Sequence, residues 1–252
     1  MPQNKALYLL FALSLICAVP AMAAECALKD RACVINSLRE AAGKIETVAW
    51  RDQTYRELAK TLAFDGDTDG AIALIEKIET PDTKAMTIRG IGMAAADNNL
   101  SKEQYVDIFQ KLRVAADKIT HPPSYAIALT YIAMSQAFAG DNEGAWKTAS
   151  EMENEALRHK AYGETAEIQA EKDDYAAASK SIQFITSEAF RNKAYGTVSK
   201  ILANGKKLDD ALSAAQAITN PYKKAEALQY VLDVQKPREI SHLKNEKTGT
   251  EP

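Results

Sequence analysis

The sequence predicts an all-α protein, built as a stack of antiparallel helical hairpins with a period of about 33 residues. Alanines recur at this spacing in two series, Ala128, Ala161 and Ala194, and Ala145, Ala178 and Ala211. The tetrapeptide Lys-Ala-Tyr-Gly at residues 160–163 also returns at residues 193–196. Strand signals, such as alternating Val, Ile and Thr or Asn-Gly turns, are almost absent. A fixed period of this length is typical of stacked hairpins that cannot bury their apolar faces alone.

Residues 1–23 have the three parts of an export signal. Lys5 supplies the positive start, residues 6–19 are apolar and uncharged, and Ala21-Met22-Ala23 gives the small-x-small cleavage pattern. The apolar run of about 14 residues is shorter than the ~20 that a membrane anchor needs. We therefore predict cleavage after Ala23, a mature protein without a membrane span, and a periplasmic or secreted location in a bacterium.

The charge balance argues against a nucleic-acid partner. The whole chain has 31 basic and 34 acidic residues, and removal of Lys5 with the signal leaves 30 against 34, a net charge of −4. The charges are interspersed along the chain, whereas binding to a phosphate backbone calls for a strongly basic face.

The mature chain begins with its two cysteines, Cys26 and Cys33, which predict a disulfide in an exported protein. Positions seven apart on one straight helix are separated by about 10.5 Å, and a disulfide needs Cα atoms within about 7 Å. Both cysteines therefore cannot lie in the same helix. With Asp30 as the N-cap, the helix begins at Arg31, and residues 24–29 fold back as an arm that Cys26 ties to the first turn. A redox pair would favour the tighter Cys-x-x-Cys spacing.

The repeating part is predicted to span residues 24–235. Residues 31–46 form a first helix without a partner, since Lys-Ile-Glu-Thr at 44–47 returns at 77–80, where it ends a full hairpin. Ser101, with Gln104 three residues later, predicts a helix start. Five hairpins are expected at about 54–78, 84–119, 124–152, 158–185 and 190–218, followed by a single helix from Pro221 to about Val234. Residues 236–252 carry little to bury and are predicted to be a disordered tail.

Within the hairpins, pairs of small residues stand twelve apart, as expected where two antiparallel helices cross closely. The pairs are Ala59 and Ala71, Ala133 and Ala145, Ala166 and Ala178, and Ser199 and Ala211. Four residues before the first member stand Tyr55, Tyr162 and Tyr195, with Leu129 and Met86 as apolar substitutes. The pattern resembles the tetratricopeptide repeat family over residues 53–234. The resemblance implies a right-handed α-solenoid that binds protein or peptide partners.

The chain departs from that family in its spacing. The period is 33 rather than 34, with one expected step of 43 and a final one of 31. The position late in the second helix that is alanine in the family is Ile78, Met152, Ile185 or Ile218 here. We therefore expect a divergent relative, or another α-solenoid with similar packing.

The sequence gives no catalytic or metal-binding motif, so we predict a protein that is not an enzyme and needs no cofactor. The histidines, His121, His159 and His242, do not stand in metal-ligand spacing with another ligand. The sequence has no glycine-rich phosphate loop and no Gly-x-Ser-x-Gly elbow. Carboxylates are numerous, but no pair of them is distinguished as acid and base.

A row of lysines near the helix starts is the candidate binding feature. Lys84, Lys160, Lys193 and Lys224 each precede the expected aromatic position by two residues, in a first turn that disfavours cations. In the family that the chain resembles, this position opens onto the concave groove and holds carboxylates of bound peptides. Lys60 and Lys200, one turn deeper, would add to the row, whereas Glu167 would oppose it. The alternative is that the lysine stems merely cover apolar surface.

The sequence-based prediction of function is a periplasmic scaffold whose concave face binds a protein or peptide, one that could be acidic. It rests on likeness of fold, which is a weak basis for function. One alternative is a non-catalytic helical subunit of a cell-envelope enzyme, such as one acting on peptidoglycan. Another is an enzyme whose site is assembled between hairpins, which a closed pocket with two buried carboxylates would favour.

Overall fold

The computed structural model describes residues 26, 27 and 29–236, and the secondary structure of this part is entirely helical. The predicted signal sequence (1–23) and almost all of the predicted tail (237–252) lie outside the described residues. The helices are α1 (Arg31–Gly43), α2 (Val48–Phe64), α3 (Thr68–Ile75), α4 (Pro81–Ala96), α5 (Lys102–Asp117), α6 (Pro122–Phe138), α7 (Asn142–Ser150), α8 (Glu155–Glu171), α9 (Tyr175–Gln183), α10 (Glu188–Asn204), α11 (Leu208–Gln216) and α12 (Pro221–Gln235).

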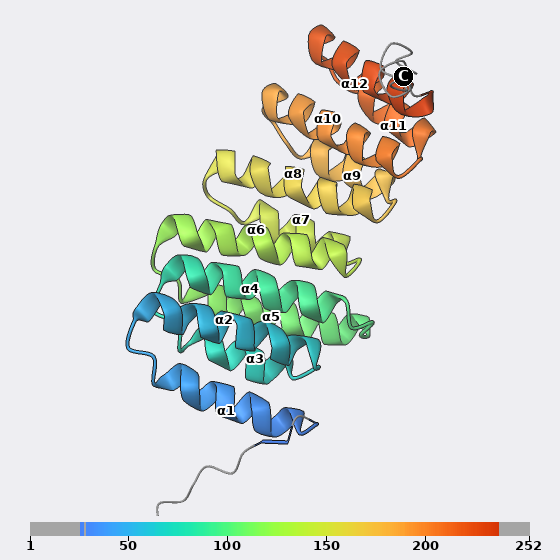
Figure 1. The fold of residues 1–252 in the computed structure, drawn as a ribbon. Coiled ribbons are helices and arrows are strands. Elements are labelled where there is room, and N and C mark those ends of the chain that lie inside the picture. Colours follow the sequence, from blue (N-terminus) through green and yellow to red (C-terminus); the bar gives the residue numbers. More distant parts are fainter. Residues whose placement is uncertain (1–25, 28, 237–252) are drawn as a thin grey trace, which may run out of the picture.

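The helices fall into two layers. We call α2, α4, α6, α8, α10 and α12 the A helices, which lie side by side in chain order in Figure 1. The helices between them, α3, α5, α7, α9 and α11, are the B helices and lie behind the A layer. All substantial contacts among the described helices join elements at most two apart in the chain. Most buried apolar residues of the described part, from Ala42 to Val231, belong to one cluster, whose substantial contacts join helices that are near one another in the chain.

Side-chain caps and turn residues fix the ends of the helices. Four B helices begin after a residue whose side chain accepts a hydrogen bond from the backbone of the first turn; these residues are Asp67, Ser101, Asp141 and Asp174. Ser101 and Gln104 form the predicted capping box. Between α2 and α3, and between α6 and α7, Gly66 and Gly140 adopt φ of 85° and 83°, a region that glycine enters without strain.

Pairs of helices occupy the ranges of the five predicted hairpins, but several A helices begin earlier than expected. α2 begins at Val48 and α4 at Pro81, ahead of the predicted 54 and 84. From α6 onward the A helices begin at equal intervals, at Pro122, Glu155, Glu188 and Pro221. The step from α4 to α6 is longer than these intervals but shorter than the expected 43. Ala85 is the fifth residue of its helix, whereas Ala128, its expected equivalent, is the seventh of α6.

This difference in spacing corrects one residue that was predicted to replace the recurring tyrosine. Ile88, rather than Met86, is the eighth residue of α4 and the equivalent of Tyr162 in α8 and Tyr195 in α10. Ile88 is fully buried, and Met86 is partly exposed. The predicted small residues at the helix crossings are all fully buried: Ala59, Ala71, Ala133, Ala145, Ala166, Ala178, Ser199 and Ala211.

The N-terminal arm has the predicted arrangement. The sulfur atoms of Cys26 and Cys33 lie at disulfide-bonding distance, with their Cα atoms 5.6 Å apart. Asp30 caps α1 by accepting a hydrogen bond from the backbone N–H of Cys33. Cys26 thus lies before the helix and Cys33 in its first turn, as the spacing requires. Arg31 also binds the Asp65 carboxylate after α2, at 2.6 Å.

Buried side chains on the A helices also hold the loops that enter the next A helix. Asp52, fully buried in α2, accepts hydrogen bonds from the backbone N–H groups of Glu79 and Thr80. In α10, Asn192 accepts from the N–H of Thr219, and His159 of α8 contacts Thr186 in the same way. Each clamp spans 27 residues, so three different side chains perform one structural task.

Candidate binding face

The candidate site is the solvent side of the A layer, which we call the A face. It is formed by the sixth, tenth and thirteenth residues of each A helix, for example Lys193, Thr197 and Lys200 of α10. All of these positions are at least partly exposed, while the crossing residues beside them are buried. The A face therefore presents one stripe of side chains per helix.

The helix bounds divide the predicted lysine row into two sets. Lys160 and Lys193 are the sixth residues of α8 and α10 and belong to the A face. Lys84 and Lys224 are the fourth residues of α4 and α12, so they do not occupy the same position. The sixth residue of α12 is Glu226. The predicted equivalence of the four lysines is therefore wrong, because the final step equals the two before it and is not the expected 31.

The fourth residue of the A helices has a structural role. This role explains why a cation stands in the first turn, where the helix dipole disfavours it. Arg158 donates a hydrogen bond of 2.7 Å to the carbonyl oxygen of Met152, and Arg191 does the same to Ile185. Both carbonyls lie just after the preceding B helix, so these cations meet the partial negative charge at its C-terminal end. Lys84 lies near the corresponding end of α3, where it helps to lower the pKa of Glu76, although the hydrogen bond from Lys118 is the largest cause.

The strongest cationic site lies between α10 and α12, and we call Lys193, Lys200, Lys223 and Glu226 the basic cradle. These residues line a cavity of about 360 Å³. Glu226 binds Lys223 at 2.9 Å and Lys200 at 3.4 Å, and these contacts lower the pKa of its carboxyl group. No ion pair of Lys193 is found in the described part of the chain. The charged side chains that line the cavity are thus three cations and one carboxylate, which is a net positive set, and Lys193 also interacts with the Glu167 carboxylate of α8.

The neighbouring helix α8 carries the opposite charge. Glu164 and Glu167 are its tenth and thirteenth residues, and Glu171 follows one turn later. Burial raises the pKa of the Glu167 carboxyl group, and repulsion from Glu164 and Glu171 raises it further, against the opposing effect of Lys193. Lys160 pairs with Glu164 at 3.5 Å. Glu167, which was predicted to oppose the lysines, therefore belongs to an acidic stripe on α8. This stripe lies between the basic cradle and an apolar zone.

The third zone is an apolar pocket between α2, α4 and α6. The apolar part of its cavity of about 450 Å³ is formed by Phe64, Met86, Gly90, Met93 and Phe138. The charged residues Arg56, Glu57, Lys60, Arg89 and Asp97 also line it. Lys60, the predicted deeper lysine of α2, lies at this pocket with its ammonium 6.0 Å from the Phe64 ring centre. Lys200 is its equivalent on α10 and lies 5.6 Å from the Tyr230 ring centre. Lys60 therefore belongs to the apolar pocket, and Lys200 belongs to the basic cradle.

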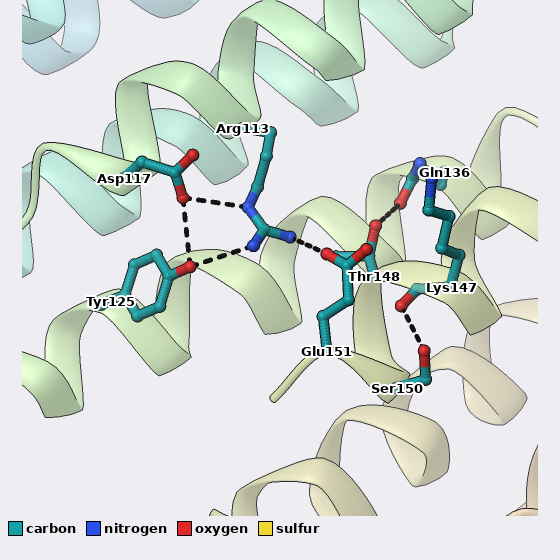
Figure 2. A network of polar contacts seen from close by, with 8 residues as sticks. All are labelled: Arg113, Asp117, Tyr125, Gln136, Lys147, Thr148, Ser150 and Glu151. Carbon is teal, nitrogen blue, oxygen red and sulfur yellow. Dashed lines mark hydrogen bonds and ion pairs between the residues drawn. The ribbon is translucent and has the colours of Figure 1, made fainter. Parts of the chain in front are cut away.

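A polar network on the other side of α6 has a structural role (Figure 2). Arg113 of α5 donates to Asp117 at 3.1 Å, to Tyr125 of α6 at 3.0 Å, and to Glu151 after α7. Burial lowers the pKa of Arg113, but its hydrogen bonds to Asp117 and Glu151 outweigh burial, so the pKa is raised. Both carboxylates are paired with Arg113, and the network joins α5, α6 and the residue after α7 at the longer step between A helices.

One constellation contains serine, histidine and aspartate but is not arranged for nucleophilic catalysis. The hydroxyl group of Ser124 bridges the other two, since it contacts His121 Nδ1 at 2.7 Å and donates to Asp82. A catalytic triad instead places the histidine between serine and carboxylate. Ser124 is also fully buried. The cluster therefore fixes the start of α6 against α4.

Within 26, 27 and 29–236, no three His, Cys, Asp or Glu side chains are grouped to hold a metal ion. Across the same residues, the helices lack the combination of length and apolar character that a membrane span requires. No family model matches the chain, and no curated protein sequence matches it.

Sequence reasoning missed part of this surface. It did not single out Lys223 and Glu226 of the basic cradle or Met93 and Phe138 of the apolar pocket. Glu226 lies 33 residues after Lys193, so the period of the helix starts from Pro122 onward would have identified the two as equivalent. The apolar pocket gave no such signal, because Met and Phe at helical spacing are equally typical of a core.

Proposed function

We propose that the protein is an α-solenoid, similar in packing to tetratricopeptide repeats, whose A face binds a protein or peptide partner. Three features support this arrangement. Contacts join near neighbours along the chain, small residues are buried where paired helices cross, and four successive A helices begin at equal intervals. Stacks of this kind use an extended surface rather than a closed pocket for binding.

The packing of the two layers supports an A face on the concave side. Each A helix is in substantial contact with the next A helix along the whole stack. Among the described B helices, substantial contact is found between α3 and α5, while the others stand further apart. The layer with the closer spacing lies on the inside of a curved stack, so the A face is its inner surface.

The observation that carries the proposed function is the basic cradle. Lys193 and Lys200 project from one helix and Lys223 from the next, around a cavity that a side chain or a chain end could enter. The pairs of Lys200 and Lys223 with Glu226 are exposed, and solvent screening makes such pairs weak. A carboxylate of a bound peptide would therefore meet available cations at little cost.

The proposed location is the bacterial periplasm or the outside of the cell. It rests on the signal-like residues 1–23 and on the cysteine pair that follows them. Expression in a bacterium followed by N-terminal sequencing tests it. A mature chain that begins at Ala24 is expected, and a retained Met1 in the cell interior would contradict the proposal.

Selection from a phage-displayed library of random dodecapeptides tests the binding function. We expect enrichment of sequences with Asp or Glu, and loss of their binding in the double variant Lys193→Glu/Lys200→Glu. The matched control is Lys77→Glu/Lys147→Glu, which reverses two exposed charges on B-layer elements and should retain binding. An unenriched library, or equal binding by both double variants, would overturn the proposal.

A further inference from the structure

Three glycines on the A helices, Gly90, Gly163 and Gly196, have room for a Cβ atom and are not required by packing, and two of them line pockets. Gly90 lies inside α4, where glycine is less favourable than alanine. A Cβ atom there would lie 3.8 Å from the nearest atom, the Cβ of Lys60, which is ordinary contact. Two residues later, by contrast, a Cβ on Gly92 would lie 2.5 Å from Ser135 Oγ. Gly92 is thus required by the approach of α6, and Gly90 is not.

The second such glycine is Gly196 of α10. A Cβ there would lie 4.0 Å from Ile218 Cδ1, so alanine would also fit. Gly196 lines the cavity of the basic cradle, as Gly90 lines the apolar pocket. Glycine inside an element is expected where a ligand approaches the backbone closely. Gly163, the equivalent of Gly196 on α8, has similar free space but lines neither of these two pockets, so the glycine alone is not the signal. Gly90 and Gly196 mark open places of the A face because each also lines a cavity.

The two open places differ in chemistry and are separated by a charged helix. The pocket at Gly90 is lined by Met and Phe side chains together with charged ones, and the pocket at Gly196 by three lysines and Glu226. Between them, α8 presents Glu164 and Glu167 on the same face. From α4 to α10, the stripes of the A face are therefore apolar on α4 and α6, then acidic on α8, then basic on α10.

The spacing of the A helices sets the length of a ligand that reaches both pockets. From α4 to α10 there are three steps between neighbouring A helices. Packed helices are about 8–10 Å apart, so the span is roughly 24–30 Å. An extended peptide advances about 3.3 Å per residue and covers this span in about eight or nine residues.

We propose that the ligand of the A face is an extended peptide segment with an apolar side chain and a carboxylate about eight residues apart, and a lysine or arginine between them. The apolar side chain enters the pocket at Gly90, the cation lies over α8, and the carboxylate binds Lys193 and Lys200. Each group of the ligand thus meets its chemical complement. The inference rests on the proposed function and specifies the ligand class of that same face.

Fluorescence anisotropy with labelled nonapeptides tests the order of the zones. The matched peptides carry tryptophan at one end, lysine in the centre and glutamate at the other end, with glycine and serine elsewhere, in both chain directions. One comparison peptide exchanges the lysine and the glutamate, and another brings the three residues within five positions. We expect one matched peptide to bind at least about tenfold more tightly than either comparison peptide, because both pockets are then filled together.

Gly90→Leu, with a matched control on the B layer, tests the apolar pocket. Gly90→Leu fills the pocket and should weaken the matched peptide by about tenfold, without changing the binding of a peptide whose tryptophan is replaced by glycine. Gln183→Leu, which adds a leucine at an exposed position of α9, is the control and should change binding by less than about threefold. Thermal unfolding by circular dichroism checks that both variants fold, as the free space at Gly90 and the exposure of Gln183 predict.

The outcomes separate this inference from the proposed function. Equal binding of the matched and charge-exchanged peptides would overturn the inference. Weakening by Lys193→Glu/Lys200→Glu together with no effect of Gly90→Leu would also overturn it, but would leave peptide binding by the basic cradle in place. Failure of all peptides, together with an unenriched library, would overturn both.

Discussion

The hydroxyl group of Ser199 in α10 donates a hydrogen bond of 2.8 Å to the carbonyl oxygen of Ala211 in α11. The two residues are twelve apart in the chain, and both are fully buried. A side chain as short as serine can reach the backbone of the facing helix because the two helices approach closely at this point. The contact shows directly why this position is small in the neighbouring hairpins.

Substitutions of Ser199 should separate size from hydrogen bonding. Ser199→Ala removes one buried donor and should lower the free energy of unfolding by about 1 kcal/mol. Ser199→Leu forces the helices apart and should cost about 1–3 kcal/mol or more. Urea unfolding monitored by circular dichroism measures both. A leucine variant as stable as the alanine variant would show that the crossing is not close.

The two glycines of α4 should respond oppositely to the same change. Gly90→Ala should raise the free energy of unfolding by about 0.5–1 kcal/mol, because the added Cβ fits and alanine favours the helix. Gly92→Ala should lower it by about 1–3 kcal/mol, because the new atom would overlap Ser135. Each variant is the control for the other. Shifts of the same sign in chemical unfolding would contradict the assigned difference.

The buried clamp at Asp52 should contribute substantially to stability. Asp52→Ala leaves the backbone N–H groups of Glu79 and Thr80 without this acceptor and should cost about 1–3 kcal/mol. Hydrogen exchange of these two amides should accelerate more than exchange in α10 and α11. Uniform acceleration along the whole chain would indicate a global effect instead of a local clamp.

The raised pKa of Glu167 predicts a pH-dependent effect of Glu167→Gln. Because the folded state binds this proton more tightly than the unfolded state, wild-type stability falls as pH rises from the ordinary glutamate pKa through the raised value. The glutamine variant lacks this fall. Melting temperatures from pH 4 to pH 8 should therefore agree at the acidic end, and the variant should be the more stable one at neutral pH. A variant that is less stable at neutral pH would contradict the assigned environment.

Much of the fold could be predicted because its determinants are local in the chain. The turns at Gly140 and Asp141, the capping box of Ser101 and the crossing alanines each depend on a few neighbouring residues. The cysteine spacing also fixed which residue lies outside the first helix. Helix starts were less accurate because the apolar residues in the first turn of α2, Val48 and Trp50, are exposed and the first turn of α4 is mostly polar, so neither follows the pattern of the core.

The site was predicted less well because it depends on register. Alanine is so common that Ala85 could be matched with Ala128, which moved Lys84 by two residues and changed its face. The apolar pocket and the basic cradle each combine side chains from different helices. Their residues are adjacent only after the stack has formed, so a period alone could not bring them together.

The central claim is a stack in which each hairpin is supported by its sequence neighbours, and removal of one end tests it most directly. A chain of residues 24–187 lacks α10, α11 and α12, which contact the remainder through α8 and α9. We expect this chain to stay helical, with an unchanged circular dichroism signal per helical residue, and to unfold cooperatively at a lower temperature. Loss of most of the helical signal would contradict the account, because it would mean that distant parts of the chain share one core.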